Sequence, residues 1–433
     1  MRKGGIVVLT AAAMVVSAHV AFAQTGLYPT GITPPELTAP EKVSVLQRPR
    51  PDYNPVGGRI GDFFFYPSAE AEGYWDSNVF YAPHPKSDFY TSLRPNLTID
   101  SDWGTSQLNF LANAEVRRFG SQVSENQTNY QLASTGRLDI LHGEYLDGGL
   151  SFQNAHEERF APSSIPTQLH PTEYQDAGGQ LKFVRERGVL GMQMNGKVDY
   201  YSYDNVFTTS GTELRESDRN RIEIAGGPKV TYEIIPDYHA FVAAAGNDRI
   251  YQSTFDSNGL KRSSHGGEVD IGTDVLITQL ISGEIFVGYM QQNYDDSRLP
   301  TIHAPGFGGS LLWNVRPSTS IRANAARTIQ EVDLFGTTAA GTVTSALQSA
   351  VGVSVEQEIL HNITATIGGS FTSLDYQGTS RTDNTVEADA GVNYLLNRMW
   401  SAGLDFTYQN RLSNTSGVGF SRALIGAKIR LQY

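Results

Sequence analysis

The last eleven residues, 423–433, have the sequence Ala-Leu-Ile-Gly-Ala-Lys-Ile-Arg-Leu-Gln-Tyr. From Ala427 onward, an apolar side chain at every second position alternates with Lys428, Arg430 and Gln432. Successive side chains of a β-strand point to opposite faces, so this alternation predicts a strand with one apolar and one polar face.

The same period of two runs upstream as far as Asp62. Clear examples are Leu108 to Val116, Ile222 to Tyr232, Val269 to Ile277 and Val386 to Leu396. Alternation alone also fits a soluble sandwich, so strand length has to decide between the two. The chain has about eighteen such runs of about ten to fifteen residues, whereas soluble strands average about five or six and tilted membrane strands need about nine to eleven. The sequence therefore predicts an all-β fold, a transmembrane antiparallel up-and-down β-barrel of about 18 strands.

Short and long connections alternate between these runs. The short ones lie at 101–104, 141–144, 185–188, 235–237, 316–319, 360–362 and 397–398. The long polar ones lie near 79–87, 119–127, 159–172, 204–217, 253–265, 296–303, 334–341, 376–382 and 412–418. Short periplasmic turns and longer extracellular loops are typical of outer-membrane barrels.

Two segments precede the barrel, which we expect to occupy residues 59–433. Residues 1–23 have a basic start, an apolar stretch and an Ala-Phe-Ala end, which predicts a cleaved signal peptide. Residues 24–58 carry seven of the nineteen prolines and predict an extended, poorly ordered periplasmic arm, either a plain spacer or a tether to a periplasmic partner. The predicted location is the outer membrane of a Gram-negative cell.

Composition excludes several kinds of chemistry. The chain has no cysteine, which rules out disulfides, thiol nucleophiles and Cys-ligated metal sites. Without Arg2 and Lys3, 31 Lys and Arg stand against 45 Asp and Glu, a net charge of −14 that argues against a nucleic-acid partner. We find no catalytic motif, no cofactor motif and no metal-ligand spacing, so we expect neither an enzyme nor a cofactor. The acidic loops at 213–218 and 294–297 are interpreted as solvated rather than as calcium sites.

Aromatic residues gather near the ends of the runs, where we expect two interfacial girdles. They are Phe63 to Tyr66, Tyr74, Trp75, Trp103, Tyr200, Tyr201, Tyr203, Trp313, Trp400, Phe406 and Tyr408.

The polar positions of the runs are candidates for the lining of a lumen. They are Asn113, Glu115, Arg117, Gln193, Asn195, Lys197, Asp199, Arg221, Glu223, Glu268, Asp270, Asp274, Arg322, Asn324, Glu387, Asp389, Asp405, Gln409, Arg411, Lys428 and Arg430. Both signs of charge are present, which suits a channel for small polar solutes. The alternative is that these charges pair in a filled lumen.

The end of the chain resembles the C-terminal signal by which outer-membrane barrels are recognised for assembly, with Ile429, Leu431 and Tyr433 in its apolar positions. Two longer blocks resemble the putative β-barrel porin family of outer-membrane proteins. The first runs from Gly58-Arg59-Ile60-Gly61-Asp62-Phe63 through Tyr74-Trp75-Asp76-Ser77-Asn78 to Ser101-Asp102-Trp103, and the second from Arg381-Thr382-Asp383 to Tyr433. The resemblance implies an outer-membrane barrel over residues 58–433 and carries no catalytic residues.

Three functions stay open at this point. The first is a diffusion channel, and the second is an outer-membrane component of exopolysaccharide export, which the resemblance also admits. The third, a rim enzyme or adhesin, has no reactive constellation to support it. The expected partners are outer-membrane lipid and lipopolysaccharide, the barrel-assembly machinery and, for the export interpretation, periplasmic export proteins. Aromatic platforms in the lumen would favour export, and Tyr201, Tyr203 and Tyr294 are the candidates.

Overall fold

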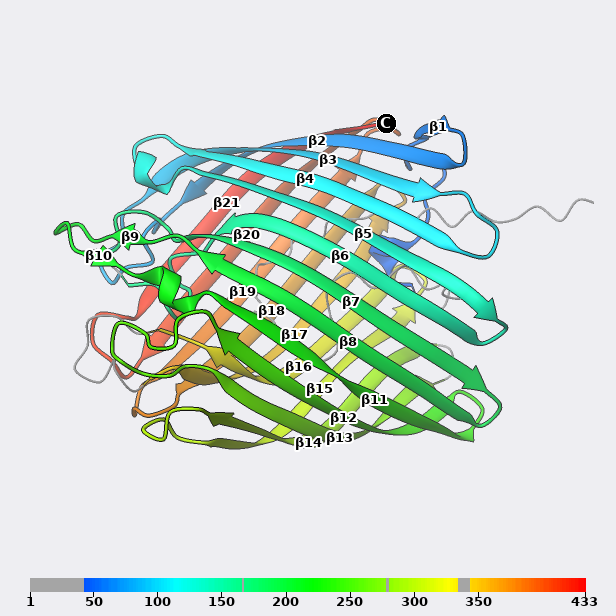
Figure 1. The fold of residues 1–433 in the computed structure, drawn as a ribbon. Coiled ribbons are helices and arrows are strands. Elements are labelled where there is room, and N and C mark those ends of the chain that lie inside the picture. Colours follow the sequence, from blue (N-terminus) through cyan, green and yellow to red (C-terminus); the bar gives the residue numbers. More distant parts are fainter. Residues whose placement is uncertain (1–42, 166, 278–279, 334–342) are drawn as a thin grey trace, which may run out of the picture.

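The computed structural model describes residues 43–165, 167–277, 280–333 and 343–433. Within these residues, eighteen long antiparallel strands pair in chain order, and the last strand pairs with the first. The closing pair joins β2 to β21, from Ser68 opposite Gln432 to Asp76 opposite Leu424. Figure 1 shows the resulting barrel of tilted strands. The predicted barrel and its strand number are confirmed.

The barrel strands have the following bounds. The first nine are β2 (Phe63–Asp76), β3 (Asp88–Ser101), β4 (Gln107–Phe119), β5 (Gln127–Leu141), β6 (Glu144–His156), β7 (Glu173–Arg187), β8 (Leu190–Tyr203), β11 (Arg221–Ile235) and β12 (Tyr238–Tyr251). The other nine are β13 (Ser264–Ile277), β14 (Ile281–Tyr294), β15 (Ile302–Arg316), β16 (Thr319–Glu331), β17 (Ser345–Leu360), β18 (Ile363–Tyr376), β19 (Thr382–Leu395), β20 (Trp400–Ser413) and β21 (Phe420–Gln432).

Apolar side chains cover the outer face of the barrel. In β13, Val269 and Ile271 are 53 % and 62 % exposed, whereas Asp270 between them is 2 % exposed. In a water-soluble barrel, polar side chains would face outward and apolar ones inward. In a membrane barrel, aliphatic side chains face the lipid hydrocarbon and polar side chains face the interior. Both faces of the alternating pattern are therefore satisfied when the strands cross a bilayer.

Connections of different length gather at opposite ends of the barrel (Figure 1). At the turn end, His142 and Gly143 alone connect β5 to β6. Gly143 has a φ of 73°, and a Cβ there would lie 2.3 Å from the Glu186 carbonyl oxygen. This tight turn requires glycine at that position. The long-loop end carries small elements of its own: β9 (Val206–Phe207), β10 (Glu213–Leu214), and the 3-10 turns η3 (Val123–Glu125) and η4 (Glu216–Arg219).

One pair of neighbouring strands is joined over only half of its length. β15 and β16 pair from Gly308 opposite Ala326 down to the turn, but residues 302–307 and 327–331 do not pair with each other. Each segment still pairs with its other neighbour, β14 or β17. Ile329 packs on Met290, Ile302 and Ala304, so the end of β16 lies over the inner face of β14 and β15. We call this half-joined region the seam.

The end of the arm contacts the barrel. Residues 43–57 include η2 (Val45–Gln47), in which Val45 is fully buried, and β1 (Gly58–Ile60) pairs with β2. This part differs from the poorly ordered arm that we expected, because it makes specific bonds to inward-facing side chains of β15, β16 and β17. The rest of the arm and the predicted signal peptide lie outside the described residues, so the division of residues 1–42 stays a prediction.

Candidate functional site: a charged constriction in the lumen

The inner face of the barrel carries all of the polar positions chosen from the sequence. On every strand but β16, these residues fall on the parity opposite to the exposed apolar residues, as Asp270 does between Val269 and Ile271. On β16, Arg322 and Asn324 share the parity of the buried Ser320. These inward positions are Asn113, Glu115 and Arg117 on β4; Gln193, Asn195, Lys197 and Asp199 on β8; Arg221 and Glu223 on β11; Glu268, Asp270 and Asp274 on β13; Arg322 and Asn324 on β16; Glu387 and Asp389 on β19; Asp405, Gln409 and Arg411 on β20; and Lys428 and Arg430 on β21. Ile429, Leu431 and Tyr433 lie on the outer face of the last strand, and Tyr433 N donates to the Pro67 carbonyl oxygen at 3.1 Å.

The loop between β6 and β7, described over residues 157–165 and 167–172, crosses the lumen near the long-loop end. Arg411 Nη2 of β20 donates to its Phe160 carbonyl oxygen at 2.6 Å. The backbone N–H of Asp333, just beyond β16, donates to Ser163 Oγ at 3.1 Å. β16 and β20 lie far round the ring from β6, so these bonds hold the loop across the pore instead of above it. Sequence analysis assigned this loop to the outside, and nothing in its composition showed where it would fold.

A cavity of about 500 Å³ lies beside this loop. The outer ends of strands from β4 round to β20 line it, together with Phe160 and Ser163 from the loop. Its charged groups are five arginines and six glutamates: Arg117, Arg219, Arg221, Arg249, Arg411, Glu115, Glu157, Glu158, Glu223, Glu331 and Glu387. A volume of this order accommodates a small solute together with water.

We call this cavity and its charged lining the constriction. Most of its arginines form ion pairs with glutamates. Arg221 Nε lies 2.7 Å from Glu223 Oε1, and Arg249 Nη1 lies 2.6 Å from Glu331 Oε1. These side chains are almost fully buried, where an unpaired charge would be costly and a hydrogen-bonded pair offsets the loss of water.

The pairing extends into the loops. Arg117 reaches both Glu115, at 3.2 Å, and Glu158 of the crossing loop, at 3.3 Å. Arg219 in turn binds Glu157 of that loop, with its Nη1 2.8 Å from Glu157 Oε2. Ion pairs thus fix the crossing loop on one side of the lumen.

Arg411 differs from the other four arginines. No carboxylate oxygen of the described residues lies within 4.0 Å of its guanidinium, which bonds instead to the Phe160 carbonyl and, at 3.4 Å, to Thr385 Oγ1. It therefore presents a positive charge that is less compensated, on the wall formed by β17 to β20.

Tyrosines in the constriction are covered by arginine side chains. Tyr201 is 1 % exposed, with the Arg221 guanidinium 4.5 Å from its ring centroid, and the Arg219 guanidinium lies 3.9 Å from the Tyr203 ring. Tyr294 donates its hydroxyl to Glu331. On Tyr201 and Tyr203, a ring face that could stack a sugar is thus covered by one of the protein's own cations.

The expected girdles need a correction. Trp75, Trp313, Trp400, Phe406 and Tyr408 lie exposed on the outer face, as girdle residues should. Tyr74, Tyr201 and Tyr203 were predicted among them but point inward and are buried. Each is next to an outward-facing partner, Trp75, Tyr200 or Ser202, so proximity to a strand end did not determine the face.

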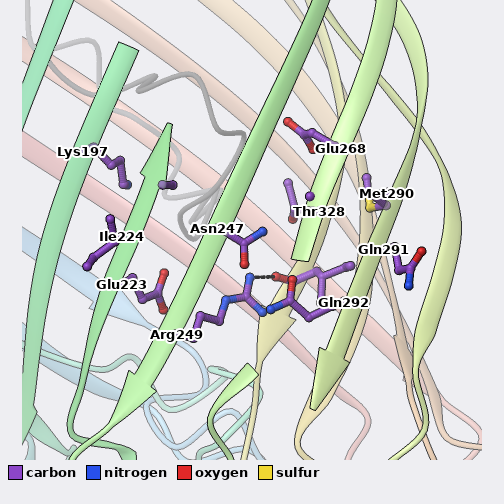
Figure 2. A pocket seen from close by; sticks show the side chains of 13 residues that line it. Lys197, Glu223, Ile224, Asn247, Arg249, Glu268, Met290, Gln291, Gln292 and Thr328 are labelled. Atoms are coloured by element: carbon purple, nitrogen blue, oxygen red, sulfur yellow. Dashed lines mark hydrogen bonds between the residues drawn. The ribbon is translucent and has the colours of Figure 1, made fainter. Parts of the chain in front are cut away.

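A smaller hollow of about 50 Å³ continues the lumen along β8 to β14. Figure 2 shows Lys197, Glu223 and Glu268 around it, with Arg249 at its edge. The dashed bond in the figure joins Arg249 Nη2 to the Ile329 carbonyl oxygen at 3.0 Å, across the overlapping end of β16. The sequence did not identify three of these charged residues, Arg249, Glu331 and Arg219, because they lie at strand ends or in a loop, where the alternation stops. The inward parity of Arg249 is the one signal that could have identified it.

Outside the strands, η4 carries a buried carboxyl group with an altered pKa. Burial raises the pKa of Glu216 to about 7, and the neighbouring Arg219 only partly opposes this. Glu216 accepts bonds from Arg219 at 2.8 Å and from Gln168 of the crossing loop at 3.3 Å. The loop between β8 and β11 is thus hydrogen-bonded to the crossing loop through Glu216, a carboxyl group whose pKa lies near 7.

No grouping of three or more His, Asp or Glu side chains that could hold a metal ion occurs in the described part of the chain. Nor does any described helix have the length and apolar character needed to cross a membrane.

Several solved outer-membrane barrels resemble this structure. OccAB3 from Acinetobacter baumannii aligns with a TM-score of 0.45 and 11 % identity over 86 % of this chain and 100 % of that chain. OccK3 (OpdO) from Pseudomonas aeruginosa aligns with a TM-score of 0.42 and 11 % identity over 85 % and 95 %. The siderophore receptor PirA from Acinetobacter baumannii aligns with a TM-score of 0.45 and 7 % identity over 89 % and 81 %.

Among curated proteins, no sequence matches this chain. The model of the family described as "Putative beta-barrel porin 2" matches residues 50–433, which include the whole barrel and the arm from Arg50 onward, and the chain therefore belongs to this family.

Proposed function

We propose that this barrel is a diffusion channel that passes small polar solutes through the outer membrane. Membership of a porin family and the closed eighteen-strand barrel indicate a channel rather than an enzyme. The observation that carries the finer proposal is the 500 Å³ cavity beside the crossing loop, whose lining includes five arginines and six glutamates.

The chemistry of the cavity favours polar solutes over apolar ones. Its arginines and glutamates lie side by side as donors and acceptors, and a solute with hydroxyl, amide or charged groups can exchange its water for these partners as it passes. Export of a polysaccharide finds less support, because the tyrosine faces that would stack sugar rings are covered by Arg219 and Arg221.

The test is conduction by the purified, refolded protein in planar bilayers, together with swelling of liposomes in sugars of increasing size. We expect discrete current steps and a size cut-off. The Phe160 ring packs against Tyr81 and Arg411, and Ser163 Oγ accepts a hydrogen bond from the Asp333 N–H. The double substitution Phe160→Gly and Ser163→Gly removes these side-chain contacts of the crossing loop, and should raise the conductance and the cut-off. Phe255→Gly, an exposed loop aromatic away from this cavity, is the matched control and should change neither. Insertion without any conductance in wild type or in any variant would refute the proposal.

A further inference from the structure

We infer that residues 43–54 form a latch that docks inside the turn-end mouth of the lumen, narrows it, and widens the pathway when it undocks. The inference rests on the proposed channel function. It concerns a different place in the molecule, because the constriction described above lies at the long-loop end.

The backbone of the latch is bound by side chains of the barrel wall. Val45 N donates to Ser320 Oγ at 2.9 Å, and Leu46 N donates to Glu356 Oε2 at 3.1 Å. Ser320 and Glu356 both have inward parity on β16 and β17 and are buried. Wall groups that would otherwise face water are thus used to hold a segment of peptide.

Two arginines of the latch meet acceptors at the same mouth. Arg48 Nη2 donates to Asn314 Oδ1 at 3.2 Å, and its Nη1 also bonds to the Pro317 carbonyl in the turn between β15 and β16. Arg50 Nη2 lies 3.2 Å from Glu358 Oε2. The basic latch thus faces an acidic part of the wall, since Glu356 and Glu358 lie on the same strand end.

The other side of the latch reaches the closing strand. Gln432 Nε2 of β21 donates to the Tyr53 carbonyl oxygen at 3.2 Å, and the Tyr53 and His361 rings are 5.9 Å apart. β17 and β21 are separated by three strands, so the segment from Val45 to Tyr53 bridges part of the opening.

The docking is incomplete in a way that suits a reversible contact. Arg50 Nε is buried with no hydrogen-bond partner among the described residues. Buried polar groups without partners cost free energy, which undocking into water would recover. Pro49 and Pro51 restrict φ on either side of Arg50, and backbone hydrogen bonds from Tyr53 and Asn54 to the Arg50 carbonyl close a turn, so the segment can move as one piece.

The absence of native cysteine makes a clean crosslinking test possible. The Val45 nitrogen and the Ser320 hydroxyl are hydrogen-bonded, which makes Val45→Cys with Ser320→Cys the pair to crosslink. A disulfide needs a Cα separation of about 4.4–6.8 Å. We expect the oxidised double variant to stay at the lowest conductance level of wild type. Deletion of residues 43–54, or the pair Arg50→Ala and Glu358→Ala, should raise the mean conductance by about 1.5-fold or more. The same double variant in reducing buffer is the control, because it carries both substitutions without the crosslink, and it should leave the lowest conductance level. Equal conductance for the locked, deleted and wild-type proteins would overturn the latch.

A second measurement does not depend on conduction. A bulky maleimide should label Val45→Cys slowly in the folded protein, and faster when Arg50→Ala and Glu358→Ala are added. Val56→Cys, at a position 59 % exposed and beyond the docked contacts, is the control and should label fast in both backgrounds. Labelling of Val45→Cys at the rate of Val56→Cys would overturn the latch even if the barrel conducts. A third outcome is slow labelling that the two alanine substitutions accelerate, in a barrel that never conducts. It would support the docking but refute the channel function, and with it the gating role of the latch.

Discussion

At the scale of single residues, inward-facing glycines let long side chains lie flat on the wall. The Tyr74 ring lies over Gly426, where an added Cβ would come within 2.1 Å of the ring, and the Tyr74 hydroxyl bonds to Asp405 at 3.3 Å. Gly426→Ala should displace the ring and destabilise the barrel by about 1–3 kcal/mol. The denaturant midpoint of the refolded protein in lipid vesicles measures this.

The control for this prediction is Gly246→Ala on β12, whose nearest atom would be 3.9 Å away and which should be nearly neutral. In the background of Tyr74→Ala, the cost of Gly426→Ala should largely disappear. A cost that persists without the tyrosine ring would show that the glycine serves some other purpose.

At the scale of elements, each strand separates lipid from lumen by parity. Ile271→Arg, near the middle of β13 and on the outer face, should cost about 2–4 kcal/mol because it places a cation in hydrocarbon. Asp270→Asn, on the inner face one residue away, should have little effect on the same unfolding midpoint. Equal losses at the two positions would mean that the register of β13 is wrong.

The loops of the long-loop end should respond to pH through Glu216. Its pKa in the folded loop, about 7, lies above the ordinary value near 4.5, so the folded loop favours the protonated carboxyl. Burying the ionised carboxylate costs folding free energy. This cost is absent below about pH 4.5, grows as the pH rises, and is complete above about pH 7. The groups that act on Glu216 electrostatically are Arg219, Glu157 and Asp333, and Gln168 is hydrogen-bonded to it.

We therefore expect the crossing loop to loosen between about pH 5 and 8, seen as faster proteolysis of residues 157–172 and noisier single-channel currents. Glu216→Gln should remove most of this dependence. Glu213→Gln, an exposed carboxyl in the same loop, should leave it intact. An unchanged pH profile in Glu216→Gln would exclude this carboxyl as the origin.

At the scale of the whole molecule, the inward carboxylates should set a mild preference for cations. Neutralising Asp270, Asp274, Glu387 and Asp389 together should shift the reversal potential in a salt gradient toward anions. Neutralising Asp62, Glu213, Asp295 and Asp375, which are exposed, should shift it little because salt screens charges more than about 10 Å from the pathway. A larger shift from the exposed set would place the selectivity outside the lumen.

The sequence predicted the barrel and the parity of its polar residues because both depend on a local period of two. It assigned the aromatics poorly where two adjacent rings, such as Tyr200 and Tyr201, lie on opposite faces at a strand end. It could not predict the crossing loop or the latch, because bonds such as Arg411 to Phe160 and Val45 to Ser320 join residues more than two hundred positions apart. Nor does alternation show that two adjacent strands stop pairing, as β15 and β16 do.

The seam between β15 and β16 has a kinetic consequence. Half of the backbone amides in residues 302–307 point toward β16 and have no partner strand there, and Pro305 has no amide hydrogen at all. In deuterated buffer, peptides from 302–307 and 327–331 should exchange their amide hydrogens sooner than peptides from β13 and β14, which pair along their whole length. The wall of this barrel should therefore not open uniformly: the first local opening, and the first strand to yield under a pulling force, should be at this one junction.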